Sequence, residues 1–218
     1  MLQSLSKSSK KTKQIFFFMF VSISSFSALY SEVNPVILFH FNEGTGSTVN
    51  DLSGNNLDGT IYNATWTSDG NALSFNGTNA RVTVPYNSAF NFSTESFSIE
   101  TWIKTTQTTY GSIVRNHVSY GYNLFIENGK AKFGIDAGHP GAIIVQSTSN
   151  VNDGNWHHLV GVRDNSDSKI KIYVDGVLEG QVDDTVGDIS STTDLWIGGK
   201  SNNQLFYNGL IDFVGIWK

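Results

Sequence analysis

The feature that most constrains the fold is a series of Asp-Gly and Asn-Gly pairs between short runs of alternating apolar and polar residues. In the run 169–174 (KIKIYV) every second residue is apolar, and Asp175-Gly176 then leads into another strand-like run. Strand side chains alternate between two faces, so this pattern predicts a strand with one buried face. Tight hairpin turns favour positive φ at both central residues, which Asp-Gly and Asn-Gly supply. Asn128-Gly129 predicts a second hairpin of this kind.

Turn signals recur along the chain after Glu32, and no window there keeps the apolar spacing of a helix. They fall at Ser53-Gly54, Asp58-Gly59, Asp69-Gly70, Asn76-Gly77, Asp153-Gly154 and Asn208-Gly209. Their spacing predicts about a dozen short strands in an all-β sandwich or barrel. The chain has only three prolines, which fits strands that must keep donating to their neighbours. No linker-like stretch divides the region, so we expect one domain over residues 32–218.

The composition argues against several classes of protein. The absence of cysteine excludes a disulfide scaffold, a thiolate metal site and a cysteine nucleophile. A net charge of −5 argues against nucleic acid as a partner, because phosphate contacts need clustered Lys and Arg. Fifteen Phe, eight Tyr and five Trp are more than a disordered chain carries, so we expect an ordered domain.

The N-terminal residues have the pattern of a secretory signal peptide. Residues 1–14 contain four lysines and no acidic residue, and 15–26 (IFFFMFVSISSF) are mostly apolar. A membrane anchor is the alternative, but the apolar stretch falls short of the ~20 residues that span a bilayer. We therefore expect residues 1–31 to be cleaved and the mature domain to be secreted or at the cell surface, with no membrane span. Removing four of the fourteen basic residues and no acidic one leaves ten against nineteen, a net charge of −9.

Four groups of segments refine the expected fold class. They are 40–46 (HFNEGTG) with 51–60 (DLSGNNLDGT), 72–77 (ALSFNG) with 81–85 (RVTVP), 96–104 (SFSIETWIK) with 153–160 (DGNWHHLV) and 173–176 (YVDG), and 195–199 (LWIGG) with 206–217 (FYNGLIDFVGIW). In this order and spacing they resemble the laminin G-like, concanavalin A-like jelly-roll domains of secreted proteins. The resemblance covers about Pro35 to Lys218. It implies a two-sheet antiparallel jelly-roll sandwich in which the first and last strands are neighbours.

The adjacent histidines His157 and His158 have the composition of a catalytic or metal-binding motif, but a structural role is favoured. Successive side chains of a strand point to opposite faces, so the two imidazoles cannot chelate one ion together. The residues that share a face with His158 are apolar: Trp156, Val160 and Val162. We expect that face, and with it His158, to lie in the core. The tryptophans of other strand-like runs are also expected there: Trp102, Trp196 and Trp217.

No catalytic arrangement is evident in the sequence. Glycoside hydrolysis needs two facing carboxylates, and hydrolases with this kind of sandwich carry two or three acids alternating along one strand. The matching run 96–104 contributes only Glu100. The motifs Gly-x-Ser-x-Gly and His-Glu-x-x-His are also absent. We therefore expect a protein that is not an enzyme.

The resemblance implies a structural Ca²⁺ where the first and last strands meet. Calcium prefers six to eight oxygen ligands, and this chain is rich in Asp and Asn beside glycine turns. Asp212 is the first candidate ligand, followed by Glu43 and Asn42 after the first strand, and Asn76 before Gly77. The alternative is that each caps a turn, which for Asn76 is at least as well supported.

A sugar site needs an exposed aromatic ring for C–H contacts and polar side chains for hydroxyl groups. Such residues gather in the region 107–121, with further candidates at 139 and 206–207. The candidates are Tyr110, Arg115, His117, Tyr120, His139 and Tyr207, with Asn116, Tyr122 and Phe206 beside them. Sandwich ligand sites lie on an exposed sheet face or in end loops. The alternative is that each is an ordinary loop residue.

Together these observations predict a secreted, non-catalytic recognition domain that binds carbohydrate on a polysaccharide or glycoprotein, with calcium as a structural ion. The alternative is an adhesion or assembly module of the same fold whose partner is a protein surface. A glycan-degrading enzyme is the third and weakest candidate, since fold alone does not fix function.

Overall fold

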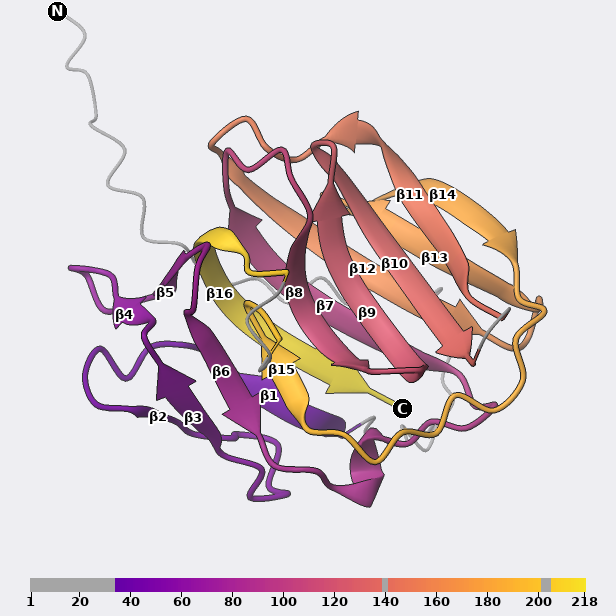
Figure 1. Ribbon diagram of the computed structural model, residues 1–218, viewed down its shortest axis with the longest axis horizontal. Coiled ribbons are helices and arrows are strands. Elements are labelled where there is room, and N and C mark those ends of the chain that lie inside the picture. The colour runs from indigo at the N-terminus through magenta and orange to yellow at the C-terminus, as the bar shows by residue number, and fades with distance from the viewer. Residues whose placement is uncertain (1–33, 139–140, 201–204) are drawn as a thin grey trace, which may run out of the picture. The chain divides into compact units, whose positions relative to one another are not determined.

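The computed structural model describes residues 34–138, 141–200 and 205–218 (Figure 1). The expected signal peptide and His139 lie outside these residues. Contacts group Val33–Lys218 into a single unit. Within the described ranges, no helix has the length and apolar character needed to cross a membrane.

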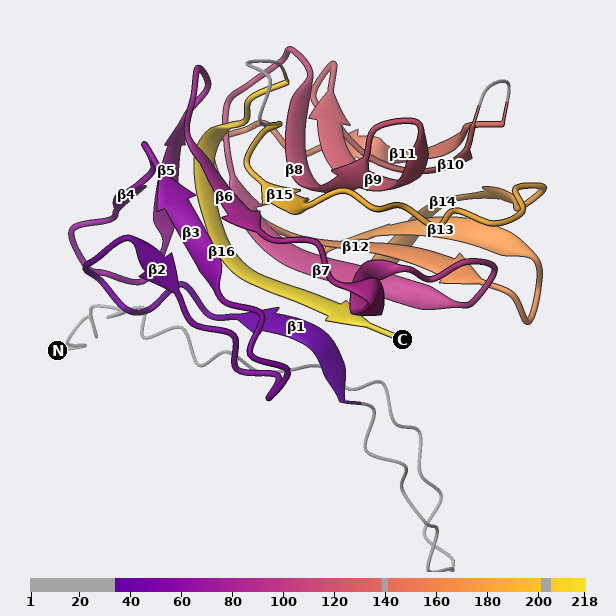
Figure 2. The ribbon, with the colours of Figure 1, turned by 60° about the horizontal axis from the view of Figure 1, so that its bottom comes forward.

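Two antiparallel sheets pack face to face (Figures 1 and 2). Sheet A has the order β14 (Val177–Asp183), β13 (Lys169–Val174), β12 (Trp156–Asp164), β7 (Phe97–Lys104), β16 (Asn208–Trp217), β5 (Leu73–Asn76) and β4 (Thr65–Trp66), with β1 (Pro35–Phe39) also paired to β16. Sheet B has the order β11 (Ile143–Asn150), β10 (Lys130–Ala137), β9 (Tyr120–Glu127), β8 (Gly111–His117), β15 (Leu195–Ile197), β6 (Arg81–Val84), β3 (Gly59–Tyr62) and β2 (Thr48–Val49). A 3₁₀ turn, η1 (Ser88–Phe90), precedes β7. The predicted sandwich, with neighbouring first and last strands, is confirmed.

The two hairpins predicted from turn signals are present. Strands β13 and β14 are joined at Asp175-Gly176, whose φ angles are +51° and +82°. Strands β9 and β10 are joined at Asn128-Gly129, with φ angles of +53° and +77°. In β13 every second residue is buried, as the alternation predicts. Local sequence therefore specifies these turns directly.

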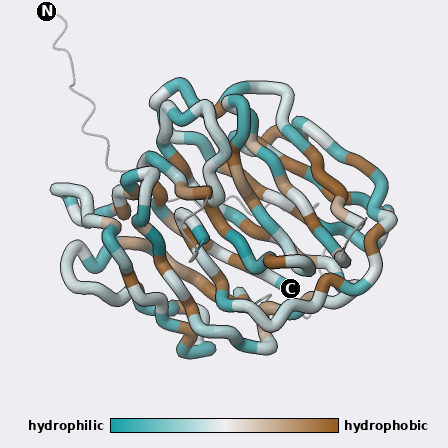
Figure 3. The backbone as a smooth tube through the Cα atoms, in the orientation of Figure 1, coloured by the Kyte–Doolittle hydropathy of each residue, from teal (hydrophilic) through white to brown (hydrophobic). Residues whose placement is uncertain are grey.

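The core fills the space between the sheets, and hydrophobic and hydrophilic residues alternate along many strands (Figure 3). Phe97 of sheet A is buried in this core, and its ring centroid lies 4.3 Å from that of Phe92 and 5.9 Å from that of Phe133 in sheet B. Gly161 of β12 faces Phe133 so closely that a Cβ there would lie 2.5 Å from its ring. A glycine at this position thus lets an aromatic residue of the opposite sheet occupy the core.

The prediction of which face of β12 is buried is wrong. Leu159, Gly161 and Arg163 are buried, so His158 and the residues that share its face point outward. The physical reason is that the inner positions include a glycine and an arginine, which weaken the apolar signal of that face. A shift of one residue exchanges the two faces of a strand, so this error reverses the whole assignment.

The outer face of sheet A carries an aromatic residue that we expected in the core. Trp102 is 38% exposed, and its ring centroid lies 5.0 Å from that of His158, whose Nε2 is 2.7 Å from Glu100 Oε1. Trp217 is half-buried, whereas Trp196 is buried as expected. The outward positions of Trp102 and His158 go together, because the register of β7 against β12 pairs these two residues.

Arg163 fixes the long connection between β14 and β15 to the core. Its Nε donates to Asp184 Oδ2 at 2.7 Å, with side-chain exposures of 2% and 5%. Its other nitrogens donate to the carbonyl oxygens of Ser93, Val186 and Gly187 at 2.6 to 3.0 Å. These four contacts therefore hold two segments that lack strand pairing, the connection between β14 and β15 and the turn before β7.

Candidate functional site

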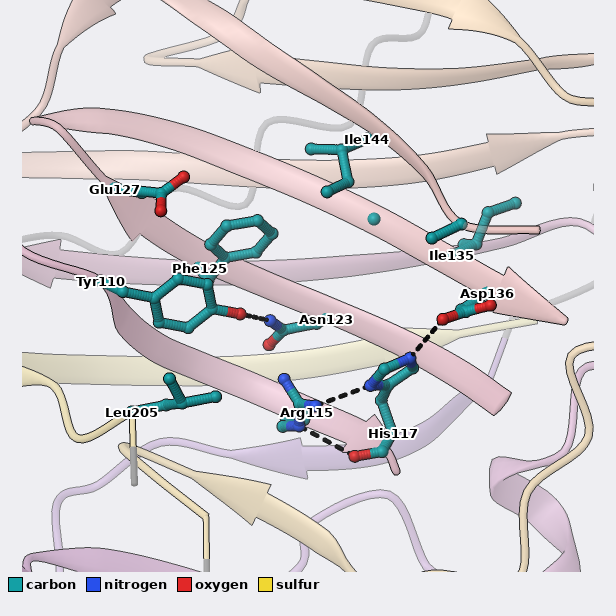
Figure 4. A pocket seen from close by; sticks show the side chains of 12 residues that line it. Tyr110, Arg115, His117, Asn123, Phe125, Glu127, Ile135, Asp136, Ile144 and Leu205 are labelled. Atoms are coloured by element: carbon teal, nitrogen blue, oxygen red, sulfur yellow. Dashed lines mark hydrogen bonds and ion pairs between the residues drawn. The ribbon is translucent and has the colours of Figure 1, made fainter. Parts of the chain in front are cut away.

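A pocket of about 350 Å³ opens on the outer face of sheet B (Figure 4). It is lined by residues of β8, β9, β10 and β11, together with Tyr110, Ala142 and Leu205. This volume lies within the ~300–1,000 Å³ range of small-molecule sites. The pocket can accommodate a ligand of the size of a sugar residue.

The floor of the pocket is a row of residues that the strand register places side by side. Arg115 pairs with Asn123, Asn123 with Gly134, and Gly134 with Ile144. Gly134 has no side chain to fill the space, and a Cβ there would meet Ile144 at 3.2 Å. The hollow therefore exists because one member of the row is glycine.

One wall is an aromatic pair. The rings of Tyr110 and Phe125 are stacked, with centroids 4.6 Å apart and planes inclined by 18°. Burial raises the pKa of the Tyr110 hydroxyl, so it stays protonated and can donate. The Asn123 amide satisfies its neighbours when its oxygen faces Tyr110 and its nitrogen donates to Ser112 Oγ at 2.9 Å and Val114 O at 3.2 Å. Polar atoms and ring surface are thus held in fixed positions.

The opposite end of the pocket holds a chain of three polar side chains (Figure 4). Arg115 donates from Nε to the carbonyl oxygen of His117 at 2.9 Å and from Nη2 to its Nδ1 at 2.6 Å. A guanidinium only donates, so Nδ1 accepts and the proton sits on Nε2, 3.0 Å from Asp136 Oδ2. Burial lowers the pKa of His117, although the hydrogen bond to Asp136 acts in the opposite direction. The lowered pKa keeps the imidazole in this neutral tautomer at neutral pH.

Three of the predicted sugar-site residues meet in this pocket: Tyr110, Arg115 and His117. Tyr120 is 48% exposed but does not line the pocket; its ring lies over Gly138, where a Cβ would be 2.8 Å away. His139 lies outside the described residues.

Three other aromatic candidates point into or toward the core. Tyr207 is fully buried, with its ring centroid 6.3 Å from Phe75, and Tyr122 and Phe206 are also buried. An exposed ring at Tyr207 was therefore a wrong expectation. Burial of Tyr207 follows from its position in the sheet interface just before β16, where Phe75 supplies apolar surface.

Sequence reasoning missed the pocket residues of β9 and β10, among them Asn123, Phe125, Gly134 and Asp136. Their outward positions could be inferred from the alternation of β9 and β10 around the Asn128-Gly129 turn. Their proximity to Arg115 depends on the pairing of β8 with β9, which no local pattern specifies.

The proposed metal ligands are distributed around β1, β5 and β16. Asp212 is buried beside Trp102 at a bulge in β16. Glu43 Oε1 accepts from the backbone N–H of Asn50 at 2.8 Å, and its buried Oε2 has no hydrogen-bond partner. Asn42 is exposed. Asn76 Oδ1 accepts from the backbone N–H groups of residues 78, 79 and 80 at 2.9 to 3.1 Å, as the turn-capping alternative expects.

Acidic and histidine side chains do not converge on a metal position in the part of the chain that the structure describes. No group of three or more His, Asp or Glu is placed there to hold an ion. A calcium site near β1 and β16 would therefore depend mainly on backbone carbonyls and amide oxygens.

Comparison with known families bears out the sequence resemblance. The sequence model of the concanavalin A-like lectin/glucanases superfamily matches residues 76–218. The chain belongs to this superfamily. The match includes every strand from β6 to β16 and all the described pocket residues.

Solved structures with a similar fold include binding domains of a mosquitocidal protein and of botulinum neurotoxins. The binding domain of Paraclostridial Mosquitocidal Protein 1 matches with a TM-score of 0.69 and 17% identity over 84% of this chain and 48% of that one. The ligand binding domain of botulinum neurotoxin serotype D, in complex with N-acetylneuraminic acid, matches with a TM-score of 0.66 and 15% identity over 84% and 47%. The binding domain of botulinum neurotoxin DC, in complex with rat synaptotagmin II, matches with a TM-score of 0.64 and 14% identity over 84% and 48%.

This chain spans about half the length of these binding domains. Their ligands belong to the longer proteins, and identities this low establish only the shared fold.

Proposed function

We propose that this chain is a secreted, non-catalytic recognition domain whose pocket on sheet B binds carbohydrate. The observation that carries the proposal is the combination of the stacked Tyr110–Phe125 pair with the polar groups of Arg115, His117 and Asn123 in one cavity. Sugars offer an apolar C–H face and hydroxyl groups, which these two kinds of surface complement. Secretion rests on the leader-like residues 1–31.

The structural relatives support a binding role over a catalytic one. Each of the three is described as a binding domain, and one is in complex with N-acetylneuraminic acid. A protein partner is the second candidate. It is favoured by the exposed Trp102 on the outer face of sheet A and by the relative in complex with synaptotagmin II.

A glycan-array screen tests the carbohydrate proposal. We expect the mature domain to bind a defined set of glycans, and Tyr110→Ala to weaken that binding about tenfold by removing one face of the aromatic wall. Tyr62→Ala is the matched control, because Tyr62 is 42% exposed on β3, which β15 and β6 separate from β8 in the same sheet.

Retention on protein partners without any glycan signal would instead favour the second candidate. Sustained release of reducing sugar by the pure domain, lost on changing one acidic residue, would establish an enzyme.

We also propose a structural calcium ion near the end of β1, where the first and last strands meet. Glu43 supports it, because a buried carboxylate oxygen without a hydrogen-bond partner is costly unless something neutralises it. The contact of His40 with Phe213, at 5.6 Å between centroids, shows that the chain after β1 continues along β16 near Asp212. When bound, calcium would take oxygens of Glu43 and Asp212 as ligands and cross-link the chain after β1 to β16.

Calcium is expected to raise the melting temperature relative to excess EDTA, because an ion that binds only the folded state stabilises it. Glu43→Gln should reduce this increase. Identical melting curves in EDTA and in millimolar calcium would contradict the metal proposal without affecting the glycan proposal.

A further inference from the structure

Arg115 carries a positive charge at the floor of the pocket and has no direct ion-pair partner among the described residues. It is 7% exposed, and its acceptors are uncharged: the carbonyl oxygen and Nδ1 of His117 at 2.9 and 2.6 Å, and the Asn123 oxygen at 3.3 Å from Nη1. No acidic side chain among the described residues forms an ion pair with it. Burying a charge without a counter-ion is unfavourable.

The two carboxylates of the pocket already have partners. Asp136 Oδ2 contacts His117 Nε2 at 3.0 Å, and Asp136 Oδ1 accepts from the Gly138 N–H at 2.9 Å. Glu127 pairs with Lys132 at 2.7 Å. Lys132 therefore neutralises Glu127, whereas Asp136 keeps its charge beside the neutral His117 and reaches Arg115 only through that imidazole.

Lys200 is a second cation whose charge interacts with that of Arg115. Burial, and then repulsion from Arg115, lowers the pKa of Lys200. Repulsion from Lys200 also contributes to the lowered pKa of His117. Lys200 does not line the pocket, but an anion bound at Arg115 would relieve the repulsion between the two cations.

Arg115 also keeps donor capacity for a ligand. A guanidinium has five N–H donors, and the contacts to His117, Asn123 and Tyr110 engage at most four of them. Figure 4 shows the guanidinium of Arg115 close to His117 and Asn123, and the Tyr110 ring lines the same cavity.

We propose that the ligand of this pocket is an acidic sugar, whose carboxylate accepts from Arg115 while its ring contacts the Tyr110–Phe125 wall. This inference rests on the proposed carbohydrate function and specifies its substrate class. A charge-assisted hydrogen bond to a desolvated guanidinium is stronger than one between neutral groups, so the carboxylate contributes much of the affinity.

The first experiment uses the unaltered mature domain and pairs of glycans that differ only at the carboxyl group. Each sialylated or uronate-containing glycan is compared with its methyl ester and with the corresponding neutral glycan. We expect the free acid to bind about tenfold or more tightly than its ester, with a difference that shrinks as salt rises.

Equal binding of acid and ester would overturn the inference and leave the carbohydrate function standing. A preference for sulfated over carboxylated glycans would overturn the carboxylate assignment. Binding to acidic peptides and to no glycan would overturn both proposals.

Variants then assign the effect to Arg115. Arg115→Gln should weaken binding of the free acid much more than binding of the ester or the neutral glycan, so that the preference for the acid is lost, and Arg115→Lys should retain part of the preference. Arg81→Gln is the matched control, because Arg81 lies over Tyr62 on β3, at 4.3 Å from the ring centroid, and does not line the pocket. Loss of the acid preference in Arg81→Gln, or its persistence in folded Arg115→Gln, would contradict the role of Arg115.

Discussion

Arg163→Ala is expected to lower the free energy of unfolding by about 3–5 kcal/mol, which corresponds to a fall in melting temperature on the order of 10 °C. The substitution leaves Asp184 buried and charged without its partner. It also removes the donor from three carbonyl oxygens in segments that have no strand pairing. Breaking one side of a buried ion pair is costly because the remaining charge stays desolvated. Urea or thermal unfolding of the purified domain measures the effect.

Lys169→Ala provides the control for this prediction. Lys169 forms a 2.6 Å ion pair with Asp183, but the two side chains are 28% and 81% exposed, so the loss should be below about 1 kcal/mol. A double replacement, Arg163→Met with Asp184→Leu, should recover much of the stability because no charge remains unpaired. Equal stabilities of Arg163→Ala and Lys169→Ala would show that the buried pair does not hold the connection.

Local patterns predicted those parts of the fold that depend on adjacent residues. The alternation of β13 and the Asp175-Gly176 turn need no information from elsewhere in the chain. The face of β12 was not predictable in this way. Gly161 is buried because Phe133 of the other sheet occupies its side-chain space, and Arg163 because Asp184 lies in a later connection. Both reasons become visible only after distant segments meet.

The same distinction applies to the candidate site. Tyr110, Arg115 and His117 were found because they lie within one short stretch of sequence that mixes aromatic and polar residues. Their partners come from other strands, since the row Arg115, Asn123 and Gly134 is created by register. Tyr207 looked equivalent to Tyr110 in composition, yet it contributes its ring to the core. Residue type thus suggested the chemistry, whereas strand pairing selected which residues take part.

Filling the hollow of the pocket is expected to abolish ligand binding while the sandwich stays folded. In Gly134→Val the added side chain would occupy the floor beside Ile144 and Phe125, the nearest side chains to a Cβ at this position. Gly134 does not have a positive φ, and valine favours strands, so the backbone can accept it. We expect affinity for the bound glycan to fall at least about a hundredfold, equivalent to ~2.7 kcal/mol.

A matched glycine substitution separates this steric effect from general destabilisation. Gly187→Val places the same side chain where a Cβ would meet no atom within 4 Å, and it should leave binding unchanged. Glycan binding and the melting temperature are measured for both variants. If folded Gly134→Val binds as well as the unaltered domain, the ligand lies elsewhere on the molecule, and the outer face of sheet A around Trp102 becomes the next surface to test. Because Gly134→Val leaves the pocket's charged and aromatic side chains in the sequence, its loss of binding would identify the hollow itself as the requirement.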